Sequence, residues 1–236
     1  MILIAVDKMD YGNMLSDSFG YTKEGVLEKT NKWIILMIAT LILAIPLYGY
    51  VMKVFRGEKP APEVTDWGTL FIDGIKLFIV GFIYFLPVII LEVILMVILG
   101  AAFVSGDPSA MMAGAGLSGL IGLLILLLVI IIAILLPIAA IRFARTNSFG
   151  EAFNFGAILE TIGKIGWINY ILALIIGAIV IGIPVGIVYF ILMMIALAIP
   201  VVGFLILIVA MLIIIPLVAV FKGRYITQVF DSASAA

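Results

Sequence analysis

The amino-acid sequence predicts an all-α fold: a polytopic transmembrane helix bundle of about five hydrophobic segments, with two amphipathic helices at the cytoplasmic interface. Hydrophobic residues make up 66% of the 236 positions and charged residues only 11%, whereas about a quarter of a soluble domain is charged. Several apolar runs exceed the roughly 20 residues that cross a bilayer core. The third observation is a motif that occurs twice, each time ahead of an apolar run.

This motif joins an amphipathic segment to the start of a hydrophobic run. Residues 17–21 read acidic, small, Phe, small, aromatic, and residues 151–155 follow nearly the same pattern. In both copies a Trp-Ile pair, beginning at Trp33 or Trp167, follows the Phe at the same distance. We infer a weak internal repeat in which an interfacial helix leads into a membrane helix.

Composition also excludes several functional classes. The 13 basic and 14 acidic residues give a net charge of −1, so no bulk electrostatic attraction favours a nucleic-acid partner. The chain lacks Cys and His, which removes thiol nucleophiles, the usual zinc ligands and the commonest general base. No phosphate-binding, dinucleotide or nucleophile-elbow motif stands in the sequence. We therefore expect no catalytic residues, no metal and no cofactor.

The N-terminal stretch does not have the pattern of a signal peptide. Residues 1–6 are apolar, but no basic region precedes them and no small-residue cleavage site follows. Translation could begin at Met9 instead of Met1. We therefore expect one membrane domain over residues 9–236, with residues 1–8 as an upstream extension. Residues 10–25 then place apolar and charged side chains on opposite sides of a helix. We interpret it as an interfacial helix, with a solvent-exposed cytoplasmic helix as the alternative.

The first hydrophobic run, residues 33–51, is barely long enough to cross a bilayer and is interrupted by Pro46. Lys and Arg flank it on both sides, although cytoplasmic flanks are the ones that collect basic residues. A re-entrant hairpin and a spanning helix are therefore equally weighted. Residues 56–66 form a loop, and Thr65 or Asp66 is expected to cap the helix that starts at Trp67.

The next two hydrophobic segments are predicted at residues 76–104 and 117–144. Trp67, Phe71 and Lys76 mark the headgroup zone before the first of them, and residues 105–108 close it. A flexible stretch at 110–116 precedes the second. Glu63, Asp66 and Asp73 near Lys76 could form an acidic surface site, but helix capping and solvated loop charges explain them better.

The second interfacial helix is predicted over residues 149–165, introduced by a capping box between Ser148 and Glu151. From 167 to 221 the chain stays apolar, which suits two tilted helices with a turn at 199–203. We expect Lys222 and Arg224 to end the last helix and residues 231–236 to be a disordered tail. Basic residues occur at 53–76, 142–164 and the C-terminus but not at 105–116 or 199–203. This pattern predicts a plasma-membrane protein with both interfacial helices and its C-terminus in the cytoplasm.

Several stretches together resemble the domain of unknown function 4013 family, small polytopic membrane proteins that are mainly archaeal. The residues that carry the resemblance are 9–12, 15–25, 66–68 with 73–74, 84–87 and 145–167. The likeness extends over nearly the whole chain from Met9 and favours that residue as the start. The family has no established activity, so the resemblance implies a fold and leaves function open. A weaker likeness is to the membrane domain of some glycerophosphodiester phosphodiesterases, whose catalytic motif this chain lacks.

Glu92 is the candidate functional residue within the membrane, because a carboxylate there costs several kcal/mol unless it is protonated, paired or hydrated. It could bind a cation or carry a proton; the favoured alternative is a neutral, hydrogen-bonded side chain near the outer interface. Gly182, Pro184 and Gly186 form a small-xxx-small spacing that favours close helix packing. A broken, substrate-binding helix is the alternative.

Trp33, Trp67 and Trp167 are expected interfacial anchors. The expected partners are membrane lipids, other membrane proteins or a second copy of the chain. A non-enzymatic structural or interaction protein is the leading function. A transporter or channel component that uses Glu92 and the kinked helices comes second, and a membrane enzyme third, since general acid-base chemistry has few candidate residues here.

Overall fold

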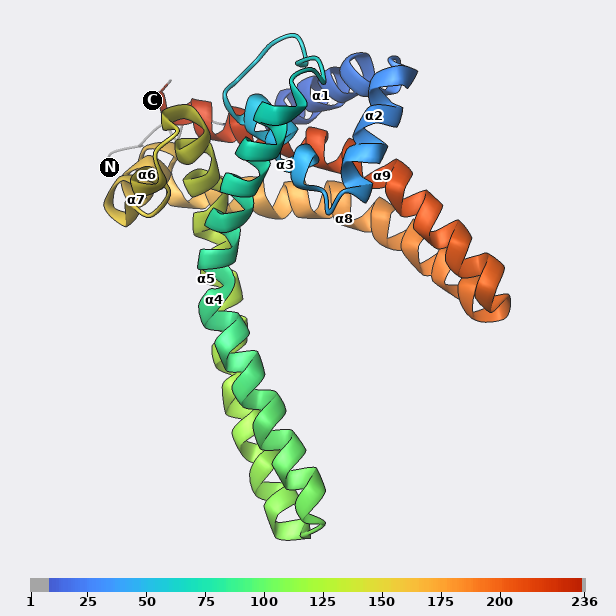
Figure 1. The fold of residues 1–236 in the computed structure, drawn as a ribbon. Helices are drawn as coiled ribbons and strands as arrows, with labels where there is room; N and C mark the ends of the chain where they lie inside the picture. The colour runs from blue at the N-terminus through green and yellow to red at the C-terminus, as the bar shows by residue number, and fades with distance from the viewer. Residues whose placement is uncertain (1–8, 235–236) are drawn as a thin grey trace. The chain divides into compact units, whose positions relative to one another are not determined.

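The computed structural model describes residues 9–234, which contain helices, turns and loops but no strand. This result confirms the all-α prediction (Figure 1). The expectations for residues 1–8 and 235–236 lie outside the described part. The elements are α1 (Tyr11–Thr22), the π-helix η1 (Lys23–Leu27), α2 (Thr30–Leu41), α3 (Ile45–Phe55), α4 (Trp67–Ser105), α5 (Pro108–Thr146), α6 (Phe149–Ala152), α7 (Phe155–Ile165), α8 (Trp167–Ala198), α9 (Pro200–Asp231) and the 3₁₀ helix η2 (Ser232–Ser234).

The contacts divide the described residues into two compact units. The first contains residues 9–78 and 138–234, and the second contains residues 79–137. The second unit is a helical hairpin made from the later part of α4 and the earlier part of α5. The single membrane domain over 9–236 stays a prediction.

Four helices are long and apolar enough to cross a membrane, namely α4, α5, α8 and α9. Each contains an internal proline: Pro87, Pro137, Pro184 or Pro216. At most 17% of the most apolar stretch in any of these helices is buried within the chain. Such surfaces need lipid or another apolar partner, so the four helices indicate a multi-pass membrane protein.

The first hydrophobic run forms two helices that pack on each other rather than one long helix. α2 ends at Leu41, and the backbone then turns through Leu43 and Ala44, both left-handed with φ of 53° and 56°. Pro46 lies in the first turn of α3. Backbone N–H groups in the first turn of a helix make no intrahelical hydrogen bond, so a proline there costs none. The interruption therefore comes just before this proline.

α4 and α5 are both longer than the predicted segments. α4 begins at Trp67, as predicted, because Asp66 caps it by accepting from the Thr69 backbone N–H at 3.3 Å and the Thr69 hydroxyl at 2.5 Å. The stretch 110–116 is helical in α5, so the expected flexible stretch is wrong. Asp107 accepts from the Ser109 backbone N–H at 2.9 Å, and Pro108 opens the helix. Both features stabilise a helix start at this position.

The chain reverses direction where the turn at 199–203 was predicted, since α8 ends at Ala198, but the turn is shorter than expected because α9 already begins at Pro200. A Cβ on Gly203 would lie 2.4 Å from the Ala196 Cα, so glycine permits the close return of the chain. α9 does not end at Arg224 but continues to Asp231. The reason is that the segment beyond Gly223 is largely buried, mainly against α1 and α3, which stabilises further helical turns.

The tail predicted to be disordered, residues 231–236, is ordered over the residues that the structure describes. Ser232–Ser234 form η2, and the Ser232 hydroxyl donates to the Val229 carbonyl at 2.7 Å. Asp231 is held by Arg145 at 2.5 Å. The first residues of the tail are therefore held by contacts that the sequence alone did not predict.

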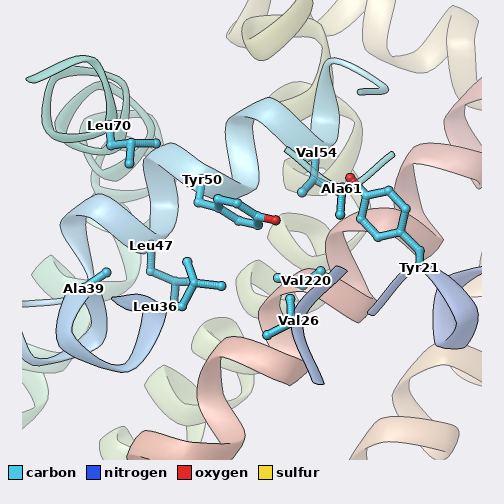
Figure 2. Close-up of a cluster of buried hydrophobic side chains, with 10 residues drawn as sticks. All are labelled: Tyr21, Val26, Leu36, Ala39, Leu47, Tyr50, Val54, Ala61, Leu70 and Val220. Carbon is cyan, nitrogen blue, oxygen red and sulfur yellow. The ribbon is translucent and has the colours of Figure 1, made fainter. Parts of the chain in front are cut away.

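The core of the first unit lies where α3 crosses its neighbours (Figure 2). It contains Tyr21, Val26, Leu36, Ala39, Leu47, Tyr50, Val54, Ala61, Leu70 and Val220. Two glycines allow the closest approaches: a Cβ on Gly49 would lie 2.0 Å from the Leu70 carbonyl oxygen, and one on Gly74 would lie 1.8 Å from that of Ile45. α3 and the start of α4 are therefore in backbone contact.

Candidate functional site: an ion-pair layer at the helix ends

Every Lys and Arg of the chain lies outside residues 77–141, and many of their partners lie in the first compact unit beside them. We use the name ion-pair layer for this group of side chains. It consists of Asp17, Lys29, Lys32, Arg56, Lys59, Glu63, Asp73, Arg142, Arg145, Glu151, Arg224 and Asp231. The layer joins α1, α2, α3, the loop 56–66, the start of α4, the end of α5, α6 and the end of α9.

Asp17 on α1 accepts from the Arg224 Nε on α9 at 2.7 Å and from the Lys59 Nζ at 3.2 Å. The Arg224 side chain is only 6% exposed, and its guanidinium lies over the Tyr21 ring. Burial raises the pKa of Asp17, but the hydrogen bonds from Arg224 and Lys59 lower it more, so the net pKa is below its ordinary value. Burial raises the pKa of Tyr21 to about 12. The carboxylate therefore stays charged opposite its cations.

Gln228 of α9 adds uncharged hydrogen bonds between α9 and α1. Its side-chain amide donates to the Met14 carbonyl at 3.0 Å and to the Ser18 hydroxyl oxygen at 2.8 Å. Ser18 and Thr22 are buried and donate to carbonyls one turn earlier in α1. The face of α1 that meets α9 is thus partly polar, while Phe19 is 59% exposed.

Lys32 fixes the loop 56–66 from the side of α2. The residue is only 4% exposed, and its ammonium donates to the Ala61 and Pro62 carbonyls at 3.2 and 2.9 Å. It also pairs with Glu63 at 3.0 Å. Burial lowers the pKa of Lys32, and the Glu63 carboxylate opposes that shift. Carbonyl dipoles and one carboxylate thus compensate a desolvated charge.

Arg56 and Arg145 tie four helices together at one point. Arg56 at the end of α3 pairs with the buried Asp73 of α4 at 2.7 Å, and its Nε donates to the Ala144 carbonyl at 3.0 Å. Arg145 near the end of α5 pairs with Asp231 of α9, and its Nε donates to the Phe55 carbonyl at 3.1 Å. Both carbonyls belong to the last turn of a helix, where intrahelical donors are missing. Each arginine therefore caps the helix to which the other belongs.

Glu151 does not form the predicted capping box. Ser148 makes no side-chain cap bond, and Glu151 accepts from Arg142 instead. A guanidinium offers a charge-assisted hydrogen bond, which is stronger than one to a neutral amide. The Glu160 side chain pairs with Lys164 at 2.8 Å, and Asn154 caps α7 through the Ala157 N–H at 3.1 Å.

The two copies of the repeated motif share one feature that the sequence did not reveal. The acidic residue at the head of each copy, Asp17 or Glu151, binds an arginine near the end of a long apolar helix, Arg224 or Arg142. The sequence does show single arginines at the ends of apolar runs, which indicates that they need acidic partners. Their partners could not be assigned without the packing of the helices.

The residues singled out from sequence lie apart from this layer. Glu92 is exposed on α4 in the second unit, and within residues 9–234 it has neither a hydrogen-bond nor an ion-pair partner. Gly182, Pro184 and Gly186 are exposed on a continuous α8. No described atom beyond the local backbone would meet a Cβ on either glycine within 4 Å. Close packing at this point therefore needs another molecule.

The three tryptophans have different surroundings. Trp67 and Trp167 are 37% and 46% exposed at the first residues of α4 and α8. Trp33 is half-buried, and its indole N–H donates to the Ile213 carbonyl of α9 at 3.1 Å. Pro216 follows three residues later and perturbs the helix at this point. Trp33 therefore binds a backbone group beside a proline.

The carboxylates of the ion-pair layer are all paired. Each accepts from at least one cation. Among the described residues, no group of three acidic side chains is placed to hold a metal ion. The described ion pairs thus join helix ends to one another.

Comparison with known proteins gives a family match. Residues 33–197 match the family described as Protein of unknown function (DUF4013). No curated protein and no solved structure matches the chain. The matched stretch begins at Trp33, so it includes Arg56, Asp73, Arg145 and Glu151 but not α1 or α9. Because it covers more than half of the 236 residues, the chain belongs to the family Protein of unknown function (DUF4013).

Proposed function

We propose that this protein is a non-enzymatic membrane scaffold that organises lipids or partner membrane proteins at the inner face of the plasma membrane. The observation that carries the proposal is the exposure of its long helices, of which at most 17% of the most apolar stretch is buried within the chain. The polar side chains meanwhile hold helix ends to one another. A chain built in this way offers apolar surface to neighbours and keeps its charges for its own stability.

The proposed orientation has the ion-pair layer, both interfacial helices and the C-terminus in the cytoplasm. It is supported by the basic residues at positions 23–76, 142–164 and 222–224, which all belong to the first unit. α7 buries Ile158 and Ile162 while leaving Leu159 43% exposed. An apolar side chain exposed beside charged ones suits a helix at the lipid headgroups.

The proposed membrane content is four spanning helices and one re-entrant hairpin, formed by α2 and α3. The short arms of the hairpin support this assignment, since α2 has 12 residues and α3 has 11. A helix needs about 20 residues to cross the hydrocarbon core. The basic residues on both sides of the hairpin are then on one membrane face.

Impermeant thiol labelling tests the orientation, because the chain is free of cysteine. Single cysteines at Asn13 and Glu160 report on α1 and α7, and one at Ser105 reports on the α4–α5 turn. We expect the first two to react from the same face and Ser105→Cys from the opposite face. Reaction of Asn13→Cys and Glu160→Cys from opposite faces would instead favour an inverted-repeat carrier.

Native mass spectrometry of the protein in polymer discs tests the scaffold. We expect one lipid class to be retained above its share of the surrounding membrane, or a protein partner to co-purify reproducibly. Thermal stabilisation by a particular ion, together with flux of that ion through proteoliposomes, would contradict the scaffold.

The second candidate function is a transporter or channel component, and Glu92 is the observation that favours it. An exposed carboxylate without a described partner on an apolar helix costs several kcal/mol in lipid unless it is neutral or hydrated. If this function holds, Glu92→Gln abolishes a measurable ion flux in proteoliposomes, whereas Asp107→Asn at the neighbouring turn does not. Equal flux in both variants would remove Glu92 from consideration.

A further inference from the structure

The α2–α3 hairpin ends in a tip made of exposed apolar side chains. Leu41, Ile42 and Leu43 are 62%, 40% and 85% exposed. Leu43 and Ala44 hold left-handed backbone conformations, which residues with a Cβ rarely adopt. In water this segment would combine a strained turn with solvated leucines. Insertion into lipid would remove these apolar side chains from water, which is favourable.

The hairpin is fixed below its tip on two sides. On α2, Trp33 donates to the Ile213 carbonyl and Lys32 to the carbonyls of the 56–66 loop. On α3, the Tyr50 hydroxyl donates to the Pro62 carbonyl at 3.0 Å. Leu36 and Leu47 face each other within the buried cluster in Figure 2. The tip is therefore presented by a rigid base.

The contact with α4 gives the depth of the tip. Ile45, the first residue of α3, lies against Gly74, since a Cβ there would meet the Ile45 carbonyl oxygen at 1.8 Å. Lys76 follows two residues later and bonds the Asn147 side chain at 3.2 Å, beside the ion-pair layer. Leu43 stands only two residues before Ile45. The tip thus lies near the level at which α4 leaves the polar zone, not at the far membrane face.

We propose that the hairpin tip inserts shallowly into the leaflet that borders the ion-pair layer and acts as a wedge, which makes the protein favour curved membrane. This inference rests on the proposed scaffold function and names lipid acyl chains of one leaflet as the occupant around residues 41–43. Shallow apolar insertions reach about 5–10 Å into the headgroup and acyl boundary, and their binding depends on curvature. In the first unit α8 and α9 are long enough to pass through both leaflets, whereas the hairpin adds volume to one.

The lysines and arginines at the base argue for lipid rather than protein around the tip. Lys29 and Lys32 flank the start of α2, and Lys53 and Arg56 lie at the end of α3. The charges thus stand at one end of the hairpin and the leucines at the other. This polarity follows that of a bilayer from headgroup to acyl chain.

The first test is the depth of the tip in proteoliposomes. A fluorophore on Leu43→Cys is expected to be quenched best by shallow lipid-borne quenchers, and the unlabelled thiol is expected to resist impermeant reagents from both faces. Glu58→Cys in the neighbouring loop is the matched control and reacts from one face. Reaction of Leu43→Cys from the face opposite to Glu58→Cys would overturn the proposal, because the hairpin would then span.

The second test is sorting by curvature on single vesicles of mixed diameter. We expect the wild-type protein to be at least about twofold denser on the smallest vesicles than on the largest, and the Leu41→Asn/Leu43→Asn variant to lose this preference. Val201→Asn is the control, since Val201 is 77% exposed at the α8–α9 turn. Equal sorting of wild type and the tip variant would overturn the wedge, as would loss of sorting in Val201→Asn alone.

The two proposals fail in different ways. If the protein retains lipid or a partner but shows no sorting, the wedge is wrong and the scaffold stands. If it sorts by curvature but retains nothing and conducts ions, the scaffold is wrong. Thermal unfolding of the tip variant in detergent should match wild type, because residues 41–43 are exposed and lie outside the buried cluster.

Discussion

Asp17 and Arg224 are 207 residues apart in the chain and form a hydrogen-bonded ion pair of 2.7 Å. The pair joins α1 to α9 and leaves the arginine side chain only 6% exposed. Removing one partner of such a pair leaves a buried charge without compensation, which costs more than the pair itself contributes. The contact therefore matters for how the first unit closes.

We predict that Asp17→Asn lowers the free energy of unfolding by about 1–2 kcal/mol, a value reduced for the partial exposure of Asp17. Thermal unfolding in detergent measures it. Glu24→Gln is the control, since Glu24 is an exposed acid on η1 and its change should leave the midpoint unchanged. Identical midpoints for the two variants would contradict the role of the pair.

The same pair predicts a dependence of stability on acid. The folded-state pKa of Asp17 is lowered, so its contribution is present above the unfolded-state pKa and is lost as pH falls through the folded value. Stability should hold from neutral pH to about pH 4 and decline below it. A midpoint-against-pH curve measures this, and Asp17→Asn should decline less in that range. Parallel curves for the two proteins would count against it.

Arg145→Lys should destabilise the junction of α3, α5 and α9. One guanidinium donates through Nε to the Phe55 carbonyl and through Nη to Asp231, and a single ammonium cannot reproduce that fork. We expect a loss of about 1–2 kcal/mol of unfolding free energy. Lys164→Arg, in an exposed pair on α7, provides the comparison and should have no effect. The prediction fails if the two conservative exchanges behave alike.

Trp33→Phe should remove the hydrogen bond to the Ile213 carbonyl while keeping most of the apolar contact. The expected loss is about 1 kcal/mol. Trp67→Phe is the matched exchange, because Trp67 is 37% exposed at the start of α4. The difference in unfolding midpoint between the two variants is the measurement, and its absence would show that the indole N–H is unimportant.

Gly74→Ala should prevent α3 from packing on α4. Its Cβ would lie 1.8 Å from the Ile45 carbonyl oxygen, a distance that only backbone displacement relieves. We expect the variant to lose folded yield. Gly81→Ala, on the same helix with no atom within 4 Å of the new Cβ, should be neutral or stabilising by up to about 1 kcal/mol. Size-exclusion profiles of the two proteins decide the matter.

The predictions from sequence were most accurate where one physical pattern dominates. Long apolar runs predicted the four long helices, and the turn at Pro200 followed from its proline and from the length that a membrane helix needs. The capping box at Ser148 was wrong because Arg142, at the end of the preceding helix, binds Glu151 instead. The end of α9 was wrong for a related reason: contacts with α1 and α3 continue the helix beyond Arg224.

The apolar sequence by itself determined that this chain is an all-α protein of the membrane. Hydropathy is a property of each segment alone, and so is the ability of a helix to pair its own backbone N–H and C=O groups. Tertiary structure decided which charges meet. Asp17 finds Arg224 and Arg56 caps the helix of Arg145, since ion pairs and exposed carbonyls select partners by distance in space. It also decided that residues 33–51 fold back at Leu43 and Ala44, because the packing of both arms against α9 and the start of α4 stabilises a turn that local sequence does not favour.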